Sequence, residues 1–167
     1  TAWVASEDGL SVHTLRPSDG SLMEVRALPT ITDRVRALGR SPSGGLFLLV
    51  GLRTFVLAPE GGTPWQFQTS GRLERAPAVA DSVMVLADDT GILAGLDPSK
   101  GLPRWRGTLD AAPAQAPLAT PLGFLLTTAA GDVVVVNPTD GKTTVLVPGT
   151  ARKAALALWW GDGVLVV

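Results

Sequence analysis

Cysteine is absent from the 167 residues, which excludes disulfides and thiolate metal sites. No apolar run reaches the roughly 20 residues that a membrane-spanning helix requires, so we expect no direct insertion into a membrane. Charged residues make up only 17% of the chain and the net charge is −1, which leaves no bulk field to attract nucleic acid or an anionic membrane. With 46% hydrophobic residues, the chain can fill the core of one ordinary domain.

Short catalytic motifs are also scarce. His13 is the only histidine, and no Gly-x-Ser-x-Gly elbow accompanies it, so we interpret it as a half-exposed strand residue. Asp89-Thr90-Gly91 matches the short motif of an aspartic protease loop. However, it occupies the same turn position as Ala129-Ala130-Gly131, which lies forty residues later in the next repeat. Asp88 and Asp89 lack the downstream ligands of a calcium loop. We therefore expect no catalytic, cofactor-binding or metal site, and no enzyme activity.

What the chain does contain is a forty-residue repeat. Gly91 recurs as Gly131, Gly101 as Gly141, and the dipeptide Ala76-Pro77 as Ala116-Pro117. The repeats cover approximately 1–42, 43–82, 83–123 and 124–163 of a single domain, and 164–167 begin a further strand. A period of this length predicts stacked supersecondary units rather than one unrepeated core.

Each repeat consists of short apolar runs separated by turn residues, a pattern that predicts four short strands. In the third repeat they are Val83–Ala87, Ile92–Leu96, Arg104–Leu109 and Ala116–Thr120, with turn glycines between them. The other predicted strands are Trp3–Ala5, Ser11–Leu15, Leu22–Arg26, Leu46–Val50, Thr54–Leu57, Trp65–Gln68, Ala76–Val79, Phe124–Thr128, Val133–Val136, Thr143–Val147, Ala155–Trp159 and Val164–Val167. No segment keeps a helical period, so the sequence predicts an all-β propeller of four-stranded antiparallel blades, about four in number. A sandwich would not repeat its turn chemistry every forty residues.

The run from Gly91 to Trp105 resembles the tryptophan-docking repeat of PQQ-like β-propellers. The resemblance assigns structural docking roles to Gly95, Asp97, Gly101 and Trp105, and to Trp65 in the preceding repeat, while Asn137 and Val145 replace the Asp and the Trp in the fourth. An indole at this place can lie between neighbouring blades, where its ring is buried and its N–H finds a carbonyl.

Propellers of the PQQ-like family that this chain resembles commonly close with eight blades, and this chain supplies about four. We expect missing sequence, a second copy or another subunit to complete the ring, because an open apolar sheet edge is a pairing surface. A small four-bladed ring is the alternative.

One surface pattern points to a partner. The predicted loops between third and fourth strands hold six cations, while the acidic residues of the opposite face are turn formers that cap local backbone. We expect a binding face for an acidic protein or phosphate, with Trp160 as an exposed anchor. Solvated charge, and burial of Trp160 against a further blade, are the alternatives. The cations are Arg34, Arg36, Arg72, Arg75, Arg152 and Lys153, and the acidic residues are Asp19, Glu60, Asp81, Asp97, Asp140 and Asp162.

The resemblance implies a non-catalytic scaffold for protein–protein interaction. Similar propellers include assembly-factor lipoproteins of the bacterial outer membrane, so we expect an extracytoplasmic location in the cell envelope, protein partners that include self-association, and no cofactor. Two alternatives stay open. One is a segment of a quinoprotein dehydrogenase that holds PQQ and calcium, and the other is the extracytoplasmic sensor domain of a kinase.

Overall fold

The computed structural model describes residues 2–5, 11–27, 35–40, 45–52, 54–58, 63–80, 82–149, 157–160 and 163–166, and these residues form strands and turns. None of them belongs to a helix that could cross a membrane. In chain order the strands are β1 (Ala2–Ala5), β2 (Ser11–Leu15), β3 (Leu22–Ala27), β4 (Val35–Arg40), β5 (Leu46–Val50), β6 (Thr54–Ala58), β7 (Trp65–Gln68), β8 (Ala78–Ala80), β9 (Val83–Ala87), β10 (Ile92–Leu96), β11 (Pro103–Thr108), β12 (Leu118–Thr120), β13 (Gly123–Thr127), β14 (Val133–Val136), β15 (Thr143–Val147), β16 (Ala157–Trp160) and β17 (Gly163–Val166).

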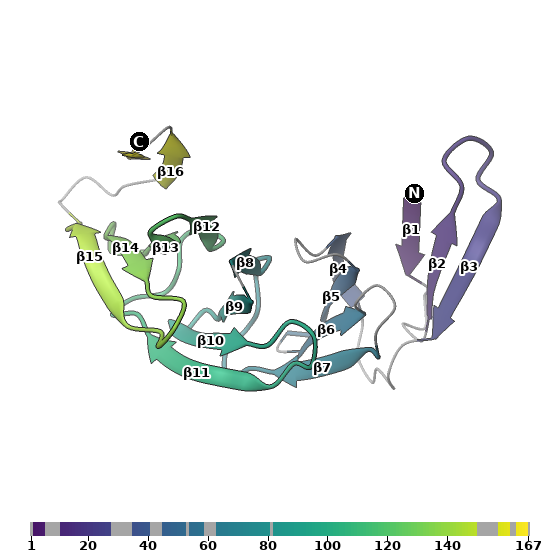
Figure 1. The fold of residues 1–167 in the computed structure, drawn as a ribbon, viewed down its shortest axis with the longest axis horizontal. Coiled ribbons are helices and arrows are strands. Elements are labelled where there is room, and N and C mark those ends of the chain that lie inside the picture. The colour runs from purple at the N-terminus through teal and green to yellow at the C-terminus, as the bar shows by residue number, and fades with distance from the viewer. Residues whose placement is uncertain are drawn as a thin grey trace. The chain divides into compact units, whose positions relative to one another are not determined.

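Every sheet is an antiparallel meander of strands that follow one another in sequence (Figure 1). The chain divides into two compact units, 1–68 and 69–167. The first unit contains the three-stranded sheet β1-β2-β3 and the four-stranded sheet β4-β5-β6-β7. The second contains the four-stranded sheets β8-β9-β10-β11 and β12-β13-β14-β15, and the hairpin β16-β17. The predicted all-β architecture of four-stranded blades is confirmed.

The sheets are offset from the sequence repeats by one strand. We predicted that Ala76–Val79 and Ala116–Thr120 would be the fourth strands of their repeats, but β8 and β12 instead begin the following sheets. The connection lengths explain the difference. β8 ends at Ala80 and β9 begins at Val83, a hairpin-length gap, whereas Thr108 and Leu118 are joined by a longer connection that leads to another sheet.

The core of the second unit lies between its two four-stranded sheets. The cluster draws on β9 and β10 from one sheet and on β13 and β14 from the other, with Val85, Leu93, Phe124 and Val134 among its members. Every residue of β9 and β13 is buried, which is why their sequences are continuous apolar runs rather than alternating ones. Because both faces of these strands are apolar, the hydrophobic pattern does not distinguish the observed register from a one-residue slip, and the hairpin turns set it instead.

In the first unit the core of the sheet β4–β7 centres on Phe55. Its ring lies 6.0 Å from that of Phe47 and 5.6 Å from that of Trp65, measured between centroids. Leu48, on the central strand β5, is also fully buried. Trp65 therefore packs against its own sheet through an aromatic contact.

The loops of the second unit gather at its two ends. The Gly91 end consists of the turns 88–91 and 128–132 and the connections 69–77 and 109–117. Backbone hydrogen bonds connect these segments, among them Leu109 N–H to Gly91 O (2.8 Å) and Asp89 N–H to Arg72 O (2.9 Å). The Gly101 end consists of the turns 97–101 and 137–141, whose glycines Gly101 and Gly141 have φ of +69° and +73°. This agrees with the sequence prediction that the turns that hold Asp97 and Asp140 lie on the face opposite the loops between third and fourth strands.

Candidate functional site

Trp105 joins the two four-stranded sheets of the second unit. It lies on β11, and its indole Nε1–H donates a 2.7 Å hydrogen bond to the carbonyl of Pro138 in the turn of the other sheet. The ring lies over Gly95, its cross-strand partner, and over Gly141. A Cβ at either glycine would overlap the indole, so the ring needs both positions free of side chain.

The corresponding position of the neighbouring sheet β12-β13-β14-β15 holds no indole, whereas Trp65 on β7 of the first unit faces Leu57 of β6 in a similar register. A β-bulge skips Arg104 in β11, so that Trp105 faces Gly95. In β15 the bulge skips Leu146 instead, so that Thr144 faces Val135, the counterpart of Gly95. Counting from Gly141 had assigned this place to Val145, and the count was off by one because sequence spacing does not show where a bulge falls.

Asp88 and Asp89 tie the 69–77 connection to the turn between β9 and β10. Asp88 is fully buried, and its Oδ2 accepts the Gly71 N–H at 2.8 Å. Its Oδ1 accepts the Thr90 N–H (3.0 Å), the Thr90 hydroxyl (2.6 Å) and the Ile92 N–H (3.0 Å). Asp89 Oδ1 accepts the Arg72 N–H at 2.7 Å. Asp88 is thus an acceptor whose two oxygens are occupied by protein donors.

This link is the feature that sequence reasoning missed. Sequence reasoning placed Asp88 and Asp89 in a turn and weighed them as calcium ligands or as part of a protease loop, but not as acceptors for the 69–77 connection. The turn interpretation of Asp89-Thr90-Gly91 is confirmed, since Gly91 N–H donates to Asp88 O at 3.0 Å and Gly91 has φ of +86°. The Thr two residues after Asp88 was a signal for a local side-chain turn, but nothing in the sequence connected Asp88 with Gly71.

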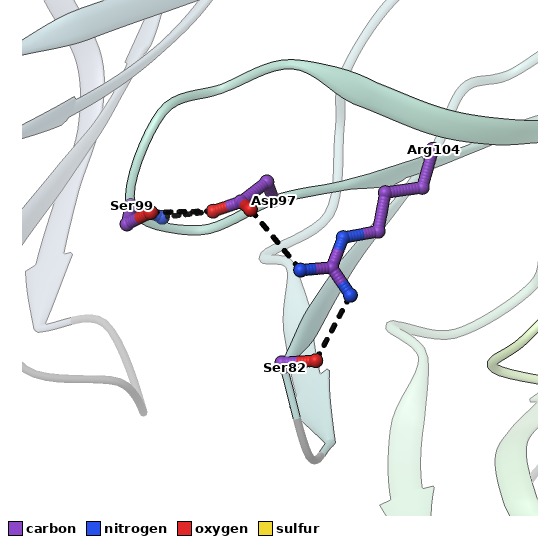
Figure 2. Close-up of polar contacts among 4 residues, drawn as sticks. All are labelled: Ser82, Asp97, Ser99 and Arg104. Carbon is purple, nitrogen blue, oxygen red and sulfur yellow. Dashed lines mark hydrogen bonds and ion pairs between the residues drawn. The ribbon is translucent and has the colours of Figure 1, made fainter.

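At the Gly101 end, Arg104 connects two turns of one sheet (Figure 2). Its guanidinium donates to Asp97 Oδ2 at 3.1 Å and to the Ser82 hydroxyl at 2.9 Å. Asp97 Oδ1 also accepts the N–H (2.9 Å) and the hydroxyl (2.6 Å) of Ser99. These hydrogen bonds from Ser99 and Arg104 lower the pKa of Asp97 from 3.8 to about 2.

The low pKa of Asp97 gives a pH dependence whose sign can be stated. Because the folded-state value lies below the unfolded value of 3.8, the carboxylate stabilises the fold above about pH 4, and this contribution disappears as the pH falls toward 2. Asp97→Asn is therefore expected to flatten the loss of stability over that window, as measured by urea unfolding at successive pH values. Asp110→Asn, which removes a charge from an exposed site, is the control. Equal slopes for wild type and Asp97→Asn between pH 4 and 2 would contradict the assignment.

Asp19 and Asp140 hold turns in the same manner. Backbone hydrogen bonds from Ser21 N–H (2.9 Å) and Lys142 N–H (3.0 Å) lower the pKa of Asp19 and Asp140. The prediction that such acidic residues cap local backbone is confirmed at Asp19, Asp97 and Asp140. Glu60, Asp81 and Asp162 lie outside the described residues.

The structure places only part of the predicted cationic face. Arg72 and Arg75 are exposed in the 69–77 connection, where Arg72 uses its backbone rather than its guanidinium to bind Asp89. Arg36 was predicted in a loop, but its backbone belongs to β4, because a bulge accommodates it as the extra residue between Val35 and Ala37. Arg34, Arg152 and Lys153 lie outside the described residues, as does the side chain of Trp160.

The surroundings of Arg72 and Arg75 are mixed in charge. Glu74, Asp89 and Asp110 are also exposed at the Gly91 end. The described part of this end is therefore no uniformly basic surface, and any recognition there depends on individual side chains rather than on a bulk field.

Successive four-stranded meanders, joined by a docked indole, define the chain as a β-propeller protein. Residues 30–155 match the model of a family described as outer membrane protein assembly factor BamB. Because this match covers well over half of the sequence, the chain belongs to that family of PQQ-like propellers, as the run from Gly91 to Trp105 had predicted. A search of curated proteins finds no match.

Solved structures with the same fold are distant in sequence. BamB from Moraxella catarrhalis has a TM-score of 0.52 and 18% identity, over 70% of this chain and 37% of its own. AztD from Citrobacter koseri has a TM-score of 0.62 and 16% identity, over 85% and 42%. Sqt1 from Saccharomyces cerevisiae has a TM-score of 0.72 and 12% identity, over 93% and 47%. The chain thus spans less than half the length of each of these structures.

Proposed function

We propose that the chain is a non-catalytic scaffold in the bacterial cell envelope, which binds a protein partner through the cations of the 69–77 connection. The observation that carries the proposal is the contrast between backbone and side chains in this segment. Gly71 and Arg72 are fixed to Asp88 and Asp89, and Leu73 is buried, while the side chains of Arg72 and Arg75 are exposed. A rigid loop that presents cations loses little conformational entropy when a partner binds.

The chemistry of the partner follows from these side chains. Two guanidinium groups form bidentate, charge-assisted hydrogen bonds with carboxylates, so the partner segment carries Asp or Glu side chains. The neighbouring Glu74 disfavours a uniformly anionic ligand and favours a segment of mixed charge. The family description, an assembly factor of the outer membrane, supports a protein partner and a location in the envelope.

The test is charge reversal at one end of the second unit. Arg72→Glu combined with Arg75→Glu is expected to reduce recovery of the partner at least tenfold, a loss of about 1.4 kcal/mol or more, with an unchanged melting temperature. The measurement is affinity capture from an envelope extract of the source bacterium, with quantitative mass spectrometry. Lys100→Glu combined with Lys142→Glu, which reverses two exposed charges at the Gly101 end, is the control and should leave recovery unchanged.

Equal recovery with the two double variants would remove Arg72 and Arg75 from the binding site. The non-catalytic part is tested separately, because quinoprotein chemistry requires PQQ and calcium. Asp88, the buried carboxylate of the described residues, accepts hydrogen bonds from protein donors at both oxygens, which supports a structural role for this carboxylate. Retention of stoichiometric PQQ after gel filtration with calcium would overturn the scaffold proposal.

A further inference from the structure

The charged side chains at the two ends of the second unit differ in their pairing. At the Gly101 end, Arg104 forms an ion pair with Asp97 (3.1 Å), and Lys142 forms one with Asp140 (3.3 Å). At the Gly91 end, five exposed charged side chains form no ion pair with any described residue, and these are Arg72, Glu74, Arg75, Asp89 and Asp110. Charges that gather in one region and are left unpaired are available to a partner.

Backbone contacts fix the order of these charges across the Gly91 end. The 69–77 connection, which holds both arginines, is bonded to Asp89, whose N–H donates to Arg72 O at 2.9 Å and whose Oδ1 accepts the Arg72 N–H at 2.7 Å. At the other end of the same turn, Leu109 N–H donates to Gly91 O at 2.8 Å, and Asp110 follows directly in the chain. The connection 109–117 contains no cation. This end is therefore mainly cationic along the 69–77 connection and anionic from Asp89 to Asp110.

Buried leucines hold both charged segments in place. Leu73, which follows Arg72, is 1% exposed, and Leu109, which precedes Asp110, is 8% exposed. The backbone after Leu109 also lies against Gly91, because a Cβ at Gly91 would come within 3.0 Å of Leu109 O. The charged side chains thus project from segments of fixed position, so a partner binds an arrangement of both signs of charge that is already formed.

We infer that Asp89 and Asp110 bind Lys or Arg side chains of the same partner segment whose Asp or Glu side chains bind Arg72 and Arg75. This inference rests on the proposed function and adds an anionic half to the partner site. Each half attracts the opposite charge and repels its own, so the two halves together select a segment that carries acidic and basic residues in one order. An all-acidic segment would bring like charges against Asp89 and Asp110, and an all-basic segment would bring them against the arginines.

The experiment compares the binding of labelled synthetic peptides to the full chain by fluorescence anisotropy. The peptides share a neutral Gly-Ser background and carry a Glu pair and a Lys pair, a Glu pair alone, a Lys pair alone, or no charge, and the mixed peptides have spacers of several lengths. The measurements are made at low ionic strength, because salt screens exposed charges. The best mixed peptide is expected to bind wild type about threefold more tightly than the acidic peptide, the effect of one exposed ion pair, and the acidic peptide more tightly than the neutral one.

Removal of the two carboxylates should change the preference between peptides rather than binding as a whole. Asp89→Asn combined with Asp110→Asn keeps an Oδ1 atom that can accept the Arg72 N–H, so the 69–77 connection stays in place. The acidic peptide is expected to bind this variant more tightly than it binds wild type, because a repulsion is lost, and the mixed peptide is expected to lose its advantage. Asp19→Asn combined with Asp140→Asn changes the net charge equally at residues that are not part of the Gly91 end, and should leave the preference unchanged.

Two results would overturn the inference and leave the proposed partner site standing: equal binding of the mixed and acidic peptides by wild type, or an unchanged preference in the variant with Asp89→Asn and Asp110→Asn. Equal binding of the charged and neutral peptides would instead remove the whole site, arginines included. Arg72→Glu combined with Arg75→Glu separates the two halves, since it is expected to abolish binding of the acidic peptide and to leave the Lys-pair peptide bound at least as tightly as by wild type.

Discussion

Replacement of Trp105 by alanine is expected to lower the free energy of unfolding by about 3–5 kcal/mol, the usual cost of truncating a large buried aromatic residue. The indole is 8% exposed and lies between two sheets, so its removal leaves a cavity that neither Gly95 nor Gly141 can fill. The carbonyl of Pro138 also loses its donor. Urea unfolding followed by far-UV circular dichroism measures the change and avoids the fluorescence of the other tryptophans.

Two further variants divide this effect between packing and hydrogen bonding. Trp105→Phe keeps an aromatic ring and removes the N–H, so it is expected to cost less than the alanine variant. Gly95→Ala keeps the whole indole but forces it to move, because the new Cβ would overlap the ring. If Trp105→Ala unfolds within about 0.5 kcal/mol of wild type, the range of ordinary surface substitutions, the indole does not hold the sheets together.

The second large effect is expected at Asp88. Asp88→Ala leaves the N–H groups of Gly71, Thr90 and Ile92 without their acceptor and opens a gap in a fully buried site. An unsatisfied buried donor costs about 1–3 kcal/mol, and the exposed Thr90 can form hydrogen bonds with water instead. The free energy of unfolding is therefore expected to fall by a total on the order of 3 kcal/mol. The measurement is again urea unfolding.

Asp89→Ala is the matched control for this variant. Asp89 is adjacent and exposed, and its side chain accepts a hydrogen bond from the Arg72 N–H, so its removal should cost less than about 1.5 kcal/mol. Amide hydrogen exchange at Gly71 gives a local readout, because protection of this N–H should fall in Asp88→Ala and persist in Asp89→Ala. Equal stability of the two variants would show that the buried carboxylate does not secure the 69–77 connection.

Much of the fold could be predicted because the signals were local. The turn glycines, and apolar runs such as Val83–Ala87 and Val133–Val136, follow from backbone sterics and burial within a few residues. The assignment of β8 and β12 to sheets failed because it depends on which neighbouring strand pairs, and a forty-residue period is the same wherever a repeat is said to begin. The place of the bulge in β15 failed for a related reason, since one extra residue leaves no mark in the spacing.

At the candidate site, too, the local features could be predicted and the contacts between distant residues could not. The sequence predicted that the Trp105 N–H finds a carbonyl, because a buried indole needs an acceptor, but it did not say which one. The bond from Gly71 to Asp88 joins residues 17 apart and has no sequence pattern. The arginines were grouped from loop positions alone, so the acidic residues Glu74 and Asp110 at the same end were overlooked. The bulge in β4 removed Arg36 from the predicted loop.

The offset between repeats and sheets has a consequence for how such chains can grow or be cut. A break after residue 82 would separate β8 from β9 and leave one fragment short of a strand, which the other fragment could restore only by complementation in trans. A break within 109–117 would instead separate intact sheets. Duplication of one sequence period inserts a unit that shares a sheet with the unit before it and another sheet with the unit after it. Elongation by recombination therefore preserves every hairpin.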